Sequence, residues 1–138
     1  MILIDTNIIS ELMKPNPFEK VIHWLDEQDN MQLFISAVTI AEINYGLSIL
    51  PEGGRRKTLE QAFKYALEEA FNSRILSFDA DAAYHYGEIL GHQKLLGKPM
   101  GVPDGQIAAI ARLHHASLAT RNIRDFADCG LVLIDPFR

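Results

Sequence analysis

Short apolar runs recur along the chain, and a stretch of helical character follows most of them. The first run, Ile2–Ile4, is wholly apolar and ends in Asp-Thr-Asn, which predicts a buried parallel strand that leads into a helix N-terminus. Four further strands are expected from similar runs, at 33–36, 74–78, 117–120 and 131–134. The pattern therefore predicts five short strands.

Helices are expected between these strands, at 7–13, 18–28, 38–50, 55–71 and 81–95, and a sixth begins near Pro103. Pro15 and Pro17 end the first of them, because proline cannot continue a helix. The turn signal Leu-Pro-Glu-Gly-Gly at 50–54 predicts that the third and fourth helices form a hairpin.

The alternation of strands and helices is typical of an α/β fold with parallel strands and right-handed crossovers. The chain has 138 residues, of which 48% are hydrophobic, and this is enough apolar surface for one core. We therefore expect a single domain covering residues 1–138. Small apolar residues at 107–111 should let the sixth helix pack closely against the sheet.

The net charge of −5 has the wrong sign for a protein that coats nucleic acid. Contact with a nucleic acid would depend on bound metal ions and on small basic groups such as Arg121 with Arg124. The longest apolar runs are interrupted by polar residues and are shorter than the roughly 20 residues of a membrane span. The lone Cys129 and an N-terminus without a signal-peptide pattern favour the cytoplasm.

Three carboxylates lie where the predicted fold would gather them. Asp5 follows the first strand, Glu42 and Asp104 lie in the first turns of helices, and Thr120-Arg121-Asn122 closes the fourth strand. In open parallel sheets, ligands bind beyond the carboxyl ends of the strands, near the point where strand order reverses. Clustered carboxylates raise one another's pKa unless a cation neutralises them, so the arrangement predicts a site for a divalent metal.

Each acid also has a structural explanation. Asp5 could cap the first helix, and Thr39-x-x-Glu42 matches a capping box in which the glutamate reaches back to a backbone N–H. Asp104 beside Pro103 is a common helix start. Taken singly, each acid leaves both explanations open, and it is their joint arrangement that favours a metal site.

Four segments of the chain resemble the PIN domain. They are Leu-Ile-Asp-Thr-Asn-Ile-Ile-Ser-Glu-Leu at 3–12, Ser-Ala-Val-Thr-Ile-Ala-Glu-Ile at 36–43, Asp-Gly-Gln-Ile-Ala-Ala-Ile-Ala-Arg at 104–112 and Leu-Ala-Thr-Arg-Asn-Ile-Arg-Asp-Phe at 118–126. More narrowly, the chain resembles the VapC toxins of bacterial toxin-antitoxin pairs, especially the branch that includes FitB. The resemblance extends from Met1 to the closing Ile-Asp-Pro-Phe.

The resemblance implies a three-layer PIN fold, with a five-stranded parallel sheet flanked by helices, and a ribonuclease site that depends on Mg²⁺ or Mn²⁺. Asp5, Glu42 and Asp104 match the family's metal-binding acidic positions. At the fourth acidic position Asn122 replaces the common aspartate, and Asp125 follows three residues later. We therefore predict Asp5, Glu42, Asp104 and Asp125 as catalytic residues, with the metal on the first three. Asn122 adds no charge to hold a second ion.

Further residues are predicted to contact the substrate or to support the carboxylates, namely Thr6, Thr120, Arg121 and Asn122. Thr6 either orients a carboxylate or simply caps the helix. Arg121 either contacts a substrate phosphate or forms an ion pair with Asp125.

The resemblance also implies a homodimer and a cognate VapB-like antitoxin that blocks the acidic site and that alone contacts operator DNA. The segment 38–71 offers an apolar face for this partner, although the same residues could be core. The alternative function is a catalytically weak PIN-fold module that partners a DNA-binding antitoxin in autoregulation. Receiver and haloacid dehalogenase chemistry is disfavoured, because each needs a second acid near Asp5 where this chain has Thr6 and Asn7.

Gly105 stands where the family more usually has alanine. We expect this replacement to be harmless at the start of a helix.

Overall fold

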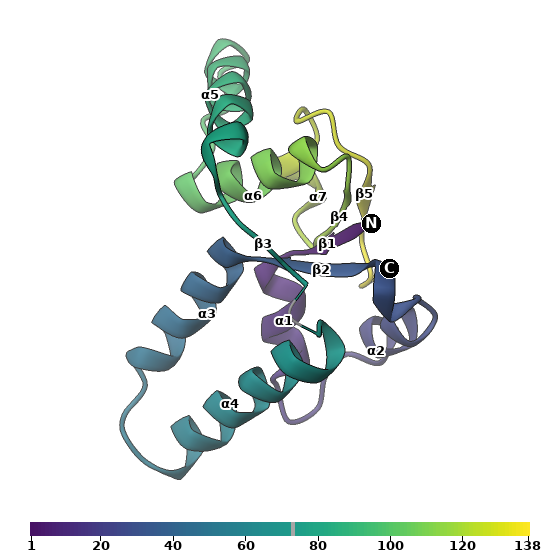
Figure 1. The fold of residues 1–138 in the computed structure, drawn as a ribbon, viewed down its shortest axis with the longest axis vertical. Helices are drawn as coiled ribbons and strands as arrows, with labels where there is room; N and C mark the ends of the chain where they lie inside the picture. The colour runs from purple at the N-terminus through teal and green to yellow at the C-terminus, as the bar shows by residue number, and fades with distance from the viewer. Residues whose placement is uncertain (73) are drawn as a thin grey trace.

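A five-stranded parallel sheet forms the centre of the molecule in the computed structural model, which describes residues 1–72 and 74–138 (Figure 1). The strands are β1 (Ile2–Ile4), β2 (Leu33–Ser36), β3 (Ile75–Leu76), β4 (Ser117–Ala119) and β5 (Leu133–Ile134). Their order is β3-β2-β1-β4-β5, and every neighbouring pair is parallel. The predicted α/β fold is confirmed.

The helices are α1 (Thr6–Leu12), α2 (Glu19–Asp26), α3 (Ala37–Ser48), α4 (Gly54–Tyr65), α5 (Ala80–Leu95), α6 (Val102–Leu113) and α7 (Ile123–Phe126). The first six match the predicted helices closely, but the one expected at 55–71 ends as an α-helix at Tyr65 and continues as a π-helical turn, Ala66–Ala70. A 3₁₀ turn, Asn30–Gln32, precedes β2. The sequence did not predict α7, because four residues are too few to show helical periodicity.

Alternate side chains of each strand enter different cores, because successive residues of a strand point to opposite faces of the sheet. Leu3 and Leu118 pack with residues of α5 and α6, whereas Ile4 and Ile35 pack with residues of α1 to α4. Helices accordingly lie on both sides of the strands in Figure 1. No helix in the described part of the chain has both the length and the apolarity that crossing a bilayer demands.

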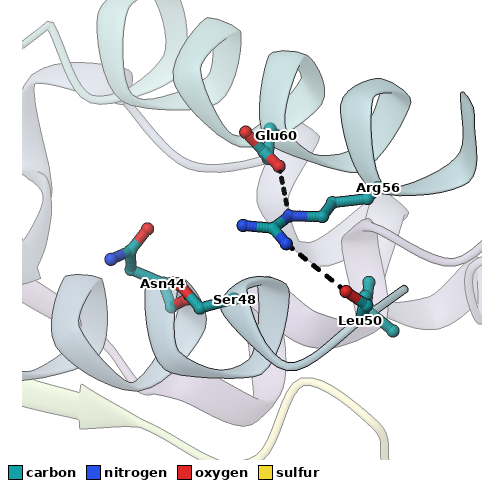
Figure 2. A network of polar contacts seen from close by, with 5 residues as sticks. All are labelled: Asn44, Ser48, Leu50, Arg56 and Glu60. Carbon is teal, nitrogen blue, oxygen red and sulfur yellow. Dashed lines mark hydrogen bonds and ion pairs between the residues drawn. The ribbon is translucent and has the colours of Figure 1, made fainter. Parts of the chain in front are cut away.

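The turn between α3 and α4 is tied down by Arg56 (Figure 2). Its Nε donates a 2.8 Å hydrogen bond to Oε1 of Glu60, and a terminal guanidinium nitrogen donates one of 3.4 Å to the carbonyl of Leu50. The hydroxyl of Ser48 donates to the carbonyl of Asn44, 2.7 Å away, within the last turn of α3. These bonds fix the predicted hairpin at the end where the turn connects its two helices.

Gly105 lets α6 approach α5 closely. A Cβ at this position would lie 2.6 Å from Cδ1 of Leu90 and 2.9 Å from Cε1 of Tyr86, both of which are side chains of α5. Interiors are packed too densely to absorb such a contact without movement. An alanine at this position would therefore require the side chains of Leu90 and Tyr86 to move.

The strand order reverses at β1, since β2 and β3 lie to one side of it and β4 and β5 to the other. Asp5 directly follows β1, and Thr120 directly follows β4, its neighbour. The backbone N–H of Asp5 donates to the carbonyl of Ala119, 2.9 Å away. Both side chains therefore lie at the switch point of the sheet, where parallel folds bind ligands.

Candidate active site

The carboxylate of Asp5 is buried and held by three donors. Oδ1 accepts the backbone N–H of Thr6 at 2.8 Å, and Oδ2 accepts the hydroxyl of Thr120 at 2.7 Å and the side-chain amide of Asn7 at 3.2 Å. Burial raises the pKa of Asp5, against the lowering effect of the bonds from Thr120 and Thr6. Asp5 does cap α1, as one explanation proposed, and the same carboxylate also lines the cavity described below.

Glu42 lies in the second turn of α3, one turn later than predicted. The capping-box explanation for Glu42 is wrong, because Ser36 caps this helix, with its hydroxyl accepting the N–H of Thr39 at 3.0 Å. Glu42 Oε1 instead accepts a 2.7 Å hydrogen bond from the hydroxyl of Thr6. The hydroxyl of Thr6 is thus bonded to a carboxylate, and the helix cap is Asp5.

Asp104 lies in the first turn of α6 and is partly buried. Its pKa is raised to about 6, first by burial and then by the negative charges of Asp5, Glu42 and Asp125. A carboxyl group that responds to three other acids lies in a region of concentrated negative charge. A cation bound there would relieve this repulsion.

One cavity of about 410 Å³ brings the three predicted carboxylates together, since Asp5, Glu42 and Asp104 all line it. Its remaining walls are polar or charged and come from Thr6, Asn7, Ser10, Glu11, Lys14, Arg121 and Asn122. The three acids come from the end of β1, from α3 and from α6, which are far apart in the sequence. Only the fold makes them neighbours.

The donor set fits a hard cation such as Mg²⁺, because carboxylate, hydroxyl and amide oxygens surround the cavity. Within residues 1–72 and 74–138, however, no three side chains of His, Cys, Asp or Glu are grouped tightly enough to enclose an ion by themselves. Mg²⁺ usually keeps several water ligands and takes only one or two carboxylates from the protein. The cavity suits that mode of binding better than a closed protein cage.

The segment after β4 holds the carboxylate of Asp5 by a hydrogen bond. Thr120 is fully buried and donates its hydroxyl to Asp5, while its Oγ1 accepts the backbone N–H of Asn122 at 3.0 Å. Asn122 lines the cavity, as its place in the sequence predicted. Thr120 thus fixes the orientation of the carboxylate and the path of the following loop together.

Arg121 and Asp125 do not form the ion pair that one of the two explanations proposed. Arg121 lines the acidic cavity, its backbone N–H donates to Oδ1 of Asn7 at 3.2 Å, and its guanidinium lies over the ring of Phe137, with Cζ 4.5 Å from the centroid. Asp125 is exposed and lines a neighbouring cavity of about 460 Å³ that shares only Asp104 with the acidic one. Asp125 therefore influences Asp104 by its charge and lies outside the group formed by Asp5 and Glu42.

Sequence reasoning missed several residues of the cavity. Asn7 bonds to both Asp5 and Thr120, and its position beside Asp5 was the available signal. Glu11 is buried and accepts Nζ of Lys14 at 2.9 Å and the N–H of Phe18 at 3.0 Å, which ties down the loop after α1. The bond from Lys14 is the main reason why the pKa of Glu11 is lowered. No pattern in the sequence predicted the contact between Arg121 and Phe137 beside the cavity.

Known proteins match this chain along nearly its full length. A family model described as the PIN domain matches residues 2–130. The VapC ribonuclease Y4jK of Sinorhizobium fredii is 39% identical over 137 residues, which is 99% of this chain and 98% of that protein. The toxin FitB of Neisseria gonorrhoeae is 36% identical over 99% of each chain. The structure of FitAB bound to an IR36 DNA fragment aligns with a TM-score of 0.93 at 36% identity, and it covers 100% of this chain and 96% of the other.

Proposed function

Because this chain belongs to the PIN-domain family, we propose that it is a VapC-type endoribonuclease, the toxin of a type II toxin-antitoxin pair. The observation that carries this proposal is the single cavity lined by Asp5, Glu42 and Asp104 at the switch point of the sheet. A cluster of hard oxygen ligands is what metal-assisted hydrolysis of a phosphodiester needs. Relatives named ribonuclease and toxin match the chain from end to end.

We propose that Asp5, Asp104 and Glu42 would hold Mg²⁺ or Mn²⁺. When bound, such an ion supplies an activated water and offsets negative charge on the phosphate oxygens. The raised pKa of Asp104 supports this assignment, because burial and its acidic neighbours favour a bound cation. Asp125 adds to the negative field at Asp104 from outside the cavity.

The polar neighbours prepare these carboxylates. Thr120 and Asn7 donate hydrogen bonds to the carboxylate of Asp5, and Thr6 donates one to Glu42. Such supporting bonds keep ligands in place before the substrate arrives. Arg121 carries a positive charge at the cavity wall, and we propose that it binds a phosphate of the RNA. Asn122 can accept or donate a hydrogen bond at the cavity wall without adding charge.

A cavity of about 690 Å³ beside the site supports an antitoxin partner. It shares Thr6, Ser10, Lys14 and Glu42 with the acidic site. Apolar residues of α3 and α4 and of the turn after α1 form much of its wall, among them Met13, Ile43, Leu47 and Leu59. An extended or helical antitoxin segment that fills this groove would reach the carboxylates directly. We propose a homodimer in which only the antitoxin contacts operator DNA, since the chain itself carries a net charge of −5.

We also propose that residues 1–138 form one PIN domain that acts in the cytoplasm. The sheet runs from Ile2 to Ile134, so both ends of the chain contribute to one structure. RNA is the proposed substrate, and the buried Cys129 is suited to a reducing compartment.

The test is cleavage of single-stranded RNA by the purified protein with Mg²⁺ or Mn²⁺, with and without excess EDTA. Asp5→Asn and Asp104→Asn should abolish the activity, because each removes a metal-binding charge while its shape is kept. Asp81→Asn is the matched control, since Asp81 lies exposed in the first turn of α5. Circular dichroism should show the same secondary structure for all three variants.

Activity that survives in EDTA would refute the metal mechanism. Calorimetric titration with Mn²⁺ distinguishes the ribonuclease from the alternative function. Ion binding by the wild type without any RNA cleavage would favour the catalytically weak binding module.

A further inference from the structure

Two aromatic rings and one guanidinium form a stack at the edge of the acidic cavity. Arg121 lies over the ring of Phe137, with Cζ 4.5 Å from the centroid. Phe137 in turn stacks on Phe18, with centroids 6.0 Å apart and the ring planes inclined by 14°. The three side chains come from the loop after β4, from the C-terminal segment and from the residue before α2.

The middle layer of this stack is fixed in place. The backbone N–H of Phe137 donates to Oδ1 of Asp135 at 2.9 Å, and Asp135 pairs with Arg138 at 3.3 Å. The ring of Phe137 also packs against the core on the α1 to α4 side of the sheet. The C-terminal segment therefore presents a rigid ring, and not a mobile tail, to Arg121.

Arg121 is an exposed residue of the cavity wall. It lines the same cavity as the three carboxylates, and its positive charge adds to the larger effect of Lys14 in lowering the pKa of Glu11. Across residues 1–72 and 74–138, no carboxylate lies within ion-pair distance of its guanidinium. A strong cation thus stands unpaired next to an acidic site.

A stacked guanidinium is well suited to bind phosphate. The ring covers one flat face, whereas the five N–H donors lie in the plane of the group and stay free at its edge. Two of these donors can bind two oxygens of one phosphate. The ring already restricts the arginine side chain, so less conformational entropy is lost when the phosphate binds. An antitoxin carboxylate could use the same donors, but the rigid placement beside the metal-binding acids favours a ligand that also meets the ion, which is the RNA backbone.

We propose that Phe137 is a positioning residue for RNA binding. It holds the guanidinium of Arg121 where it contacts a backbone phosphate next to the bond to be cleaved. This inference rests on the proposed ribonuclease function. It predicts that Phe137 belongs to the substrate-binding apparatus, although this residue lies outside the acidic motifs.

The experiment is a double-mutant cycle on steady-state RNA cleavage in Mg²⁺. Arg121→Gln and Phe137→Leu should each raise KM about tenfold while kcat changes less than about twofold, since a phosphate contact made before and during cleavage is lost. The double variant should be no worse than Arg121→Gln, because the ring acts through the guanidinium. Phe137→Tyr should keep the KM of the wild type, and Tyr84→Leu, at a ring 77% exposed on α5, is the matched control.

A second measurement does not depend on cleavage. Binding of fluorescent single-stranded RNA is followed by anisotropy with Ca²⁺ in place of Mg²⁺, over a series of KCl concentrations. The slope of log K against log salt should fall by about 0.7 in both Arg121→Gln and Phe137→Leu, as expected for one lost phosphate contact. A purely structural role for Phe137 would lower the melting temperature without changing this slope.

Three outcomes would overturn the inference: an unchanged KM and slope in Phe137→Leu, additive effects in the double variant, or no RNA binding at all by the wild type. A wild type that binds RNA with the predicted coupling but cleaves none would instead refute the proposed function and leave the positioning role standing. If the Arg121→Gln and Phe137→Leu variants bind RNA normally but lose affinity for the antitoxin, the guanidinium serves the protein partner.

Discussion

The hydroxyl of Thr6 donates a 2.7 Å hydrogen bond to Oε1 of Glu42, a residue 36 positions away in the sequence. The same hydroxyl lies 3.0 Å from Oγ1 of Thr39. The backbone N–H of Thr6 meanwhile donates a 2.8 Å hydrogen bond to Oδ1 of Asp5. Thr6 therefore donates hydrogen bonds to two of the three acids of the cavity, Asp5 and Glu42.

Replacing Thr6 with valine should weaken catalysis without unfolding the protein. The valine keeps the shape and the backbone bond to Asp5 but leaves Glu42 without its donor, so kcat/KM for RNA should fall by about tenfold or more. Thr6→Ser keeps the hydroxyl and should remain close to the wild type. Steady-state cleavage assays and thermal melts of both variants measure this, and equal activity of the valine and serine variants would contradict it.

Replacing Asn122 with aspartate should strengthen metal binding. The new carboxylate would line the acidic cavity and add a negative charge close to the proposed ion, so the Kd for Mn²⁺ should fall by about threefold to tenfold. Asn44→Asp adds the same charge on α3, outside this cavity, and should leave the Kd unchanged. Calorimetry gives both the Kd and the number of ions bound. A stoichiometry that rises with Asn122→Asp would show that the aspartate creates a second ion site.

The free energy of unfolding of the metal-free protein should depend on pH through the titration of Asp104. Its pKa is raised from 3.8 to about 6 in the folded chain, so folding favours the neutral form. This contribution is complete below about pH 4 and is lost as the pH rises through about 6, at a cost of about 1 kcal/mol once solvent screening is allowed for. Asp104→Asn should therefore gain stability over the wild type as the pH rises.

The measurement is urea unfolding of the wild type and Asp104→Asn in EDTA, from about pH 4 to about pH 7.5. Saturating Mn²⁺ should reverse the order at neutral pH, because the ion binds only the folded wild type strongly. A difference in unfolding free energy that does not vary with pH would show that Asp104 has an ordinary pKa.

Gly105→Ala should destabilise the protein by about 1 to 3 kcal/mol, because the new methyl group would press on Leu90 and Tyr86 of α5. Gly91→Ala is the matched control, since a Cβ there meets no atom within 4 Å and should stabilise α5 by about 0.5 to 1 kcal/mol. Urea unfolding measures both changes. A stable Gly105→Ala variant would mean that α5 and α6 can separate at little cost, and RNA cleavage would then report whether Asp104 has moved.

Much of the fold was readable from the sequence because the signals are local. Wholly apolar runs such as Ile2–Ile4 can be satisfied only in the middle of a sheet, and the alternation with helices forces parallel pairing. The place of Asp5 after the first strand followed from the same pattern. The four-residue helix α7 and the π-helical turn Ala66–Ala70 could not be read, because neither leaves a period in the sequence.

The sequence by itself indicated which acids would gather, since Asp5 directly follows a strand, Asp104 lies in the first turn of a helix, and Glu42 lies on the helix that follows β2. Only the tertiary structure decided what each polar group touches. In the structure, Glu42 accepts a hydrogen bond from Thr6 and does not cap a helix. Arg121 lies over the ring of Phe137 and does not pair with Asp125. The physical reason is range: strand and helix signals act over a few neighbouring residues, whereas hydrogen bonds and stacking depend on side-chain positions that exist only after distant segments have packed.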